Sequence, residues 1–153
     1  MKATTFKRLA DGRVIDLIPY IKEQLAESDN IKIYVGTDSQ SVGDHTKYAT
    51  VIVLHYGNNG GHVLYSKQII PRVRDTFTRL WNEVELSLST AEMMVEGGLP
   101  KADYIDLDLN PDPIYKSNSV LRSALGYVES LGYKARIKPN AAAASTCADM
   151  ICH

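Results

Sequence analysis

The sequence predicts an α/β protein in which a mixed β-sheet is flanked by helices. Three observations carry this prediction. Segments with alternating or β-branched apolar residues, typical of strands, recur along the chain. Longer segments with helical spacing of apolar residues lie between them. The last third of the chain runs strand, helix, strand, an order that requires a right-handed crossover between two parallel strands.

Length and composition favour a single domain over 1–153, with a loosely ordered lead-in at 1–12. A chain of 153 residues can bury about two-thirds of its unfolded surface, so one core suffices. The formal charge of −1 gives no global electrostatic signal, and a nucleic-acid partner would therefore need a local basic patch. The sequence contains no apolar run of membrane-spanning length. We therefore expect a cytoplasmic protein without a membrane partner.

A helix over 14–26 and a strand over 31–40 are the first predicted elements. Alternating Ile31, Ile33 and Val35 indicate the strand, which is expected to stop at the segment GTDSQ. Asp38 in that segment has two interpretations. It is a metal ligand or catalytic acid held by a rigid strand, or it forms the turn of a hairpin, because Asp often hydrogen-bonds its own backbone in turns.

Two further strands, 46–56 and 62–70, complete an antiparallel meander, and a long helix over 75–96 follows. Helical spacing places Glu85 and Glu92 on the flank of the apolar stripe of this helix, while Glu83 is expected to point to water. A flank glutamate can reach over the edge of the sheet into a site. Alternatively, both flank residues are solvated, as most glutamates on helix surfaces are.

The segment 102–110 alternates as a strand and places Asp106 and Asp108 on one face. Burying an unpaired carboxylate is unfavourable, so this face must be open to water, paired with bases or bound to a cation. An edge strand with one wet face is the alternative to a functional site.

The chain is expected to close with a helix from about 116 or 117 to 131, a strand at 133–137 and a final helix. Thr146 and Asp149 have the spacing of a capping box, which would place Asp149 in the first turn of the last helix. Asp149 is therefore a site carboxylate or simply a cap.

The sequence resembles the YkuK-type family of ribonuclease H-like proteins. The resemblance covers nearly all of the chain from about residue 14. It is carried by IYVGTDSQ at 33–40, IIPR at 69–72, YIDLDLNP at 104–111 and KARIKPNAAAASTCADM at 134–150. It implies a five-stranded mixed sheet in the order 3-2-1-4-5, with strand 2 antiparallel. It also implies acids that bind two divalent cations, Mg²⁺ or Mn²⁺, and cut phosphodiesters.

Carried over residue by residue, the resemblance assigns these catalytic and metal-binding acids to four positions. They are Asp38, Glu85, Asp106 and Asp149, with Glu92 and Asp108 as substitutes for the second and third.

The predicted activity is a two-metal-ion nuclease acting on RNA, RNA–DNA hybrid or branched DNA, in which the ions activate water and stabilise the leaving oxygen. The alternative is a ribonuclease H-like module that binds a nucleic acid or a protein without cutting. Candidate substrate contacts are Ser39, Gln40, Lys116, Asn118 and Lys138.

Overall fold

The structure is a computed structural model that describes residues 1–57, 60–109, 112 and 118–137. Within these residues the strands are β1 (Phe6–Arg8), β2 (Val14–Ile15), β3 (Ile31–Val42), β4 (His45–Tyr56), β5 (Gly61–Pro71), β6 (Tyr104–Asp106) and β7 (Ala135–Arg136). The helices are α1 (Leu17–Glu27), α2 (Thr76–Glu96) and α3 (Asn118–Ser130). The predicted α/β class agrees with this mixture of elements.

The described strands form one mixed sheet in the order β2-β1-β5-β4-β3-β6-β7. Strands β3, β4 and β5 are the long antiparallel meander, while β6 pairs in parallel with β3 and with β7. The five expected strands lie in the order β5-β4-β3-β6-β7 within it. The expected order is nevertheless not matched exactly as a whole sheet, because β1 and β2 extend the β5 edge.

The hairpin between β3 and β4 turns later than the sequence indicates. The strand does not stop in the segment GTDSQ but continues to Val42, and Gly43 makes the turn with a φ of +58° that other residues rarely adopt. Asp38 consequently lies in the middle of a regular ladder, directly opposite Ala49 of β4. The interpretation of Asp38 as a turn residue is wrong.

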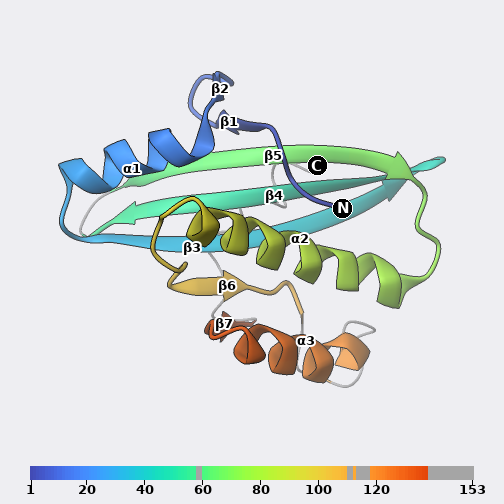
Figure 1. Cartoon of the computed structure of the whole chain (residues 1–153). Helices are drawn as coiled ribbons and strands as arrows, with labels where there is room; N and C mark the ends of the chain where they lie inside the picture. The colour runs from blue at the N-terminus through green and yellow to red at the C-terminus, as the bar shows by residue number, and fades with distance from the viewer. Residues whose placement is uncertain (58–59, 110–111, 113–117, 138–153) are drawn as a thin grey trace.

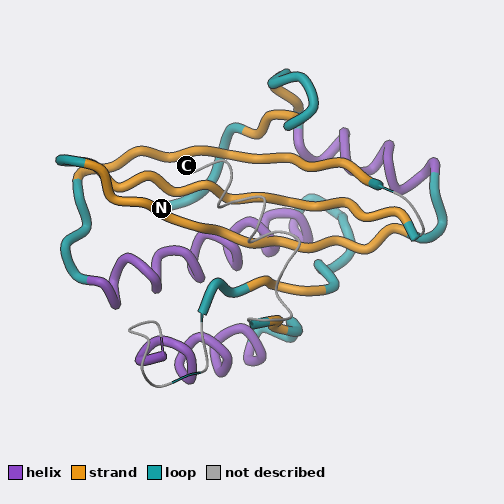
Figure 2. The backbone as a smooth tube through the Cα atoms, turned by 180° about the vertical axis from the view of Figure 1, so that it is seen from behind, coloured by secondary structure: helices purple, strands orange, loops and turns teal. Residues whose placement is uncertain are grey.

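The helices α1 and α2 lie on one face of the sheet, and α3 lies beside β7 at its edge (Figure 1). Seen from behind, the long strands lie in front of both helices (Figure 2). Alternation along β3 sends Ile33 and Val35 into the core shared with α2, whereas Tyr34 joins a small cluster around Val51 on the opposite face. One face of β3 therefore packs in the main core against α2, and the other packs in a separate small cluster.

The central helix α2 begins and ends where the sequence predicts. Asp75 caps it by accepting a hydrogen bond from the Thr78 backbone N–H at 2.9 Å, and Gly97 follows its last residue. The helix is buried on more than one side, because Trp81 stacks on Tyr127 of α3 with ring centroids 5.4 Å apart while other residues face the sheet. Its apolar stripe is therefore wider than a single contact with the sheet would require.

Several other expected elements also differ in extent, and β7 spans only Ala135–Arg136 of the expected 133–137. The lead-in at 1–12 contributes β1 and buries Phe6, so it is not loosely ordered throughout. The predicted helix over 14–26 begins only at Leu17, because Val14 and Ile15 pair with β1. Strand β6 spans three residues instead of 102–110, since its pairing with β3 ends at Asp106.

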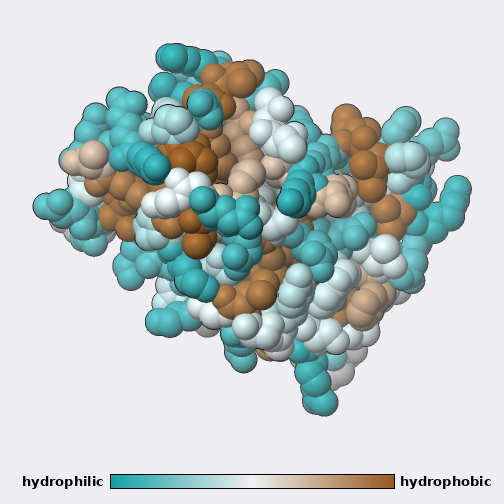
Figure 3. Space-filling view, in the orientation of Figure 1, coloured by the Kyte–Doolittle hydropathy of each residue, from teal (hydrophilic) through white to brown (hydrophobic). Residues whose placement is uncertain are grey.

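The surface that carries α1 and α2 is divided between hydrophobic and hydrophilic groups (Figure 3). Large exposed hydrophobic side chains of the described residues include Val14 of β2 and Phe77 of α2. Among the described helices, none combines the length and the apolar character needed to cross a membrane.

The buried anchor of β1 can be tested directly. Phe6 is 1% exposed, so Phe6→Ala should lower the free energy of unfolding by about 3–5 kcal/mol through lost burial and a residual cavity. The exposed neighbour Lys7 provides the control, and Lys7→Ala should change stability by less than about 0.5 kcal/mol. Urea unfolding measures both. If Phe6→Ala and Lys7→Ala both change the free energy of unfolding by the same small amount, β1 is not part of the cooperative core.

Candidate functional site

Hydroxyl groups occupy the part of β3 that follows its apolar half. Thr37 and Ser39 share the face that α2 covers, and both are buried. Thr37 Oγ1 lies 2.7 Å from Ser87 Oγ of α2 and donates to Thr50 Oγ1 of β4 at 3.2 Å. A buried hydroxyl without a partner would be unfavourable, so the polar half of the strand requires a polar stripe on the covering helix.

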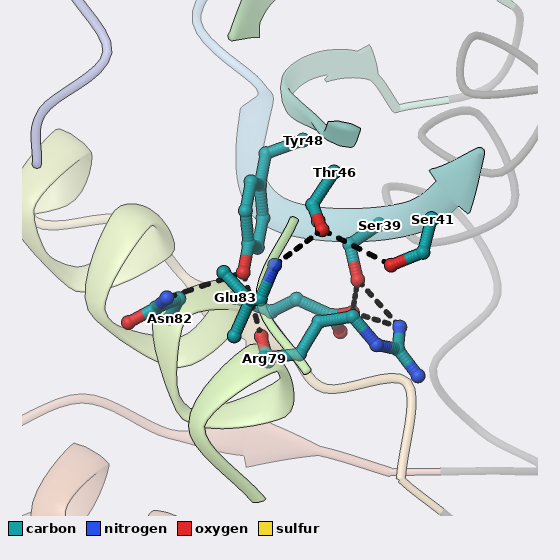
Figure 4. Close-up of polar contacts among 8 residues, drawn as sticks. Ser39, Ser41, Thr46, Tyr48, Arg79, Asn82 and Glu83 are labelled. Atoms are coloured by element: carbon teal, nitrogen blue, oxygen red, sulfur yellow. Dashed lines mark hydrogen bonds and ion pairs between the residues drawn. The ribbon is translucent and has the colours of Figure 1, made fainter. Parts of the chain in front are cut away.

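Glu83 is the acid that this stripe brings to the sheet. Its carboxylate accepts a short hydrogen bond from Ser39 Oγ, and its side chain is only 6% exposed. Arg79, one turn earlier on α2, donates from Nη1 to Ser39 Oγ at 2.7 Å and lies 3.8 Å from the Glu83 carboxylate (Figure 4). The prediction that Glu83 points to water is wrong.

Burial raises the pKa of the Glu83 carboxyl group well above its ordinary value, and the negative charges of Asp38 and Asp108 raise it further. The hydrogen bond from Ser39 and the charge of Arg79 oppose this shift without cancelling it. Acids from β3, from α2 and from the segment after β6 therefore share one electrostatic neighbourhood. Near neutral pH, the Glu83 carboxyl group retains a proton more readily than an exposed glutamate does.

The strand pairing explains how Asp38 and Asp108 come near one another. Gly36 of β3 is paired with Asp106 of β6, and this is the last paired position. Asp38 and Asp108 each lie two residues further along parallel chains, so both follow the end of the shared ladder. A narrow gap there is lined by residues of all three segments, among them Thr37, Glu83, Ser87, Asp106 and Asp108.

Asp106 has a different environment from the other acids. Arg136 of β7 donates from Nε to Oδ1 at 2.8 Å and from Nη2 to Oδ2 at 2.9 Å, a bidentate ion pair with a fully buried carboxylate. The Arg136 guanidinium also lies over the rings of Tyr34 and Tyr104, at 4.3 and 4.9 Å from their centroids. Both Asp106 oxygens are therefore engaged by a cation of the chain itself.

The two glutamates predicted for the site lie on the other side of α2. Successive residues turn by about 100°, so Glu85 is rotated by about 200° from Glu83. Burial raises the pKa of the Tyr127 hydroxyl on α3, and the charge of Glu85 raises it further. Glu92 acts in the same way on Tyr133, at the end of α3. Glu85 and Glu92 thus face α3, and the α2 acid whose pKa is affected by the charge of Asp38 is Glu83.

The remaining predicted residues are placed as follows. The Ser39 hydroxyl is engaged by Glu83 and Arg79, and Gln40 is paired with Lys47 across the hairpin. Asn118 is the first residue of α3. The predictions for Lys116, Lys138 and Asp149 lie outside the described residues.

Comparison with protein families decides the affiliation of the chain. A family model described as ribonuclease H-like matches residues 14–153. The chain belongs to the ribonuclease H-like family. Searches of curated proteins and of solved structures give no match. Membership of the ribonuclease H-like family suggests a nuclease or a nucleic-acid-binding protein, and the mixed sheet with its flanking helices is consistent with the fold of that family.

The divalent cations implied by the resemblance to YkuK-type proteins fit a set of acids that differs from the predicted ligand set. Asp38, Glu83 and Asp108 supply hard oxygen donors, which suit Mg²⁺ or Mn²⁺. Asp106 does not fit as a ligand while both of its oxygens accept from Arg136. Over residues 1–57, 60–109, 112 and 118–137, no three acidic, histidine or cysteine side chains are already arranged around one cation position.

The ion pair between Asp106 and Arg136 should be important for stability. Arg136→Gln leaves the buried Asp106 carboxylate without its cation and should lower the free energy of unfolding by about 3–5 kcal/mol. Adding Asp106→Asn to Arg136→Gln removes the unpaired buried charge, so the double variant should regain most of the lost free energy of unfolding. Urea unfolding of both single variants and the double variant gives the coupling energy. A loss below about 1 kcal/mol for Arg136→Gln would contradict a buried, mutually dependent pair.

The raised pKa of Glu83 predicts a specific pH dependence of stability. The folded protein holds this proton more tightly than the unfolded chain, so the wild type should lose stability as pH rises from about 4.5 towards the raised folded pKa. Glu83→Gln, which cannot ionise, should lack this decline. Urea unfolding at several pH values, with EDTA present, measures the difference. Parallel stability profiles for the two proteins would contradict a raised pKa.

Proposed function

We propose that the protein is a divalent-metal-dependent nuclease of the ribonuclease H-like family that hydrolyses phosphodiesters of RNA, RNA–DNA hybrid or branched DNA. The single observation that carries the proposal is the position of the Glu83 carboxyl group. It is buried on α2 against β3, within the electrostatic range of Asp38 and Asp108. The three acids come from separate elements near the end of the β3–β6 ladder. They are not already arranged around one position in the described residues, so a bound cation would have to draw them together.

Asp38, Glu83 and Asp108 would hold the cations, together with Asp149 from outside the described residues. This set differs from the prediction at two positions, with Glu83 in place of Glu85 and Asp108 in place of Asp106. Bound Mg²⁺ or Mn²⁺ would supply an activated water molecule and charge stabilisation at the leaving oxygen. A divalent cation also explains why mutually repelling carboxyl groups are gathered, because its charge would offset both their repulsion and the unfavourable burial.

Residues of the chain itself prepare this site. Ser39 orients the Glu83 carboxyl group by donating a hydrogen bond from its hydroxyl. Arg79 fixes the position of that hydroxyl by donating a hydrogen bond to it. The Arg79 side chain is 26% exposed, so part of it is accessible to solvent beside Glu83. An arginine in this position suits a phosphate oxygen of the substrate, because its planar donors match phosphate geometry.

Basic residues near the start of α2 provide the local charge that a nucleic acid needs. The overall formal charge is −1, so binding must depend on a patch. Arg72 and Arg74 are exposed in the segment between β5 and α2, and Arg79 lies on the first turns of the helix. Arg79 contacts Glu83, and these cations near the start of α2 would position a phosphodiester backbone without reading its sequence.

A non-catalytic nucleic-acid-binding module is the second candidate function. The observation that favours it is the bidentate pairing of Asp106 with Arg136, which gives a buried acid of the predicted set a purely structural partner. A protein of this kind would keep the fold and the basic patch, and it would bind a strand without cutting.

The test uses glutamates two residues apart on α2. Glu83→Gln should weaken Mn²⁺ binding at least about tenfold and reduce cleavage at least about 100-fold, because it removes a charged ligand. Glu85→Gln makes the same chemical change on the face towards α3 and should leave both unchanged. Calorimetric titration with Mn²⁺ and incubation with labelled RNA, hybrid and junction substrates provide the two measurements.

The outcomes separate the two candidate functions. Asp38→Asn should behave like Glu83→Gln if the proposed ligand set is right. If the wild type binds a nucleic acid but neither binds Mn²⁺ nor cleaves the substrates, the nuclease proposal is wrong and the binding module is supported. Cleavage that persists equally in Asp38→Asn and Glu83→Gln would indicate a contaminating nuclease and would remove the proposal.

A further inference from the structure

Two adjoining pockets lie between α1, β1 and the start of β5, away from the acids. One has a volume of about 210 Å³ and the other about 260 Å³. Both are lined by Arg8, Tyr20 and His62, so they share a wall. Small-ligand sites usually occupy a few hundred Å³. The pair therefore offers the room of one small-molecule site.

Aromatic rings form the shared wall. His62 meets Tyr20 edge to face, with ring centroids 5.9 Å apart and an interplanar angle of 88°, and Tyr20 Oη lies 3.3 Å from His62 Nδ1. Tyr56 supports His62 from another side with an interplanar angle of 89°. Mutual packing of three rings holds Tyr20 and His62 in place, and rigid rings suit the stacking of a planar ligand.

Positive charge lies beside this wall. Arg8 lines both pockets and Arg13 lines the larger one. Arg8 Nε is shielded from solvent but makes no hydrogen bond, and Asp11 Oδ1, the carboxylate oxygen paired with it, is 3.6 Å away. This distance is too long for a hydrogen bond. The Arg8 side chain as a whole is 30% exposed, but its shielded Nε–H lacks an acceptor beside a pocket. A ligand in the pocket would supply that acceptor.

We propose that these pockets bind a nucleoside monophosphate group. The phosphate would bind to Arg8 and Arg13, because guanidinium groups match phosphate oxygens. The planar base would pack against Tyr20 and His62. Glu23 and Gln24 line the larger pocket and offer a carboxylate and an amide for the polar edge of a base. A simple inorganic anion would use the arginines but leave the aromatic wall and the amide unused.

This site is separate from the proposed nuclease site and does not depend on it. His62 pairs with Leu54, which pairs with Ile33, so the pockets lie level with the start of β3. Asp38 is five residues further along that strand, a separation of about 17 Å along the strand alone. The same group could belong to a free mononucleotide or to the 5′ end of a nucleic-acid strand.

Binding experiments with the intact chain distinguish these sources. Adenosine monophosphate, adenosine and inorganic phosphate are titrated separately by calorimetry in EDTA, followed by one oligonucleotide with and without a 5′-phosphate. The monophosphate should bind at least about tenfold more tightly than adenosine or phosphate alone. Preference for the free nucleotide or for the 5′-phosphorylated strand identifies the source. Equal binding of all three small probes would overturn the proposal.

Variants locate the binding. Arg13 is exposed, so Arg13→Met should preserve the fold and weaken monophosphate binding about tenfold. Arg122→Met removes the same charge from an exposed position on α3 and should have no effect. Tyr20→Leu should remove the preference for the monophosphate over inorganic phosphate. Equal affinity in Arg13→Met, Arg122→Met and the wild type would place the ligand elsewhere and overturn the assignment.

Discussion

Desolvation of carboxyl groups is the constraint on which the arrangement of this protein depends. Four acids near the junction of β3, β6 and α2, Asp38, Glu83, Asp106 and Asp108, are buried or partly buried. Two of them, Asp106 and Glu83, compensate for the unfavourable loss of water in different ways. Asp106 has the guanidinium of Arg136, which is itself held over two tyrosine rings. Glu83 has a hydroxyl donor and a more distant arginine, and its pKa rises. The charge of the first acid is neutralised inside the fold, whereas the second acid retains its proton more readily than an exposed glutamate does.

The sequence predicted much of the fold because strong local patterns determine it. The alternation in β3, the β-branched residues of β4 and the Asp and Gly residues at the ends of α2 all agree with their final structures. The errors occur where pairing between distant segments decides the outcome. Phe6 becomes part of a strand only because β5 offers an edge, and Val14 leaves the predicted helix to pair with Lys7.

The candidate site was predicted less well, and the reason is the phase of α2. A single apolar stripe suggested that Glu83 faced solvent, but the helix contacts both the sheet and α3. Because α2 buries one surface against the sheet and another against α3, the average direction of its apolar residues lies between the two and does not point at the sheet. A usable signal was present in the hydroxyl residues. Ser87 lies one turn after Glu83, and together they match the polar residues Thr37 and Ser39 of the strand that they cover.

The position of the acids also follows from the unequal lengths of the parallel strands. Strand β6 ends at Asp106, whereas its partner β3 continues for six more residues after Gly36. Where two parallel strands separate at their carboxyl ends, side chains from both converge on a space that a neighbouring helix can enter. Asp38 and Asp108 lie just beyond that point, and Glu83 reaches it from α2. Asp106 lies within the ladder, where β7 places Arg136 beside it, so its role is to fix the strands. The end of a β-ladder thus separates an acid that supports the fold from the acids that we propose bind a cation.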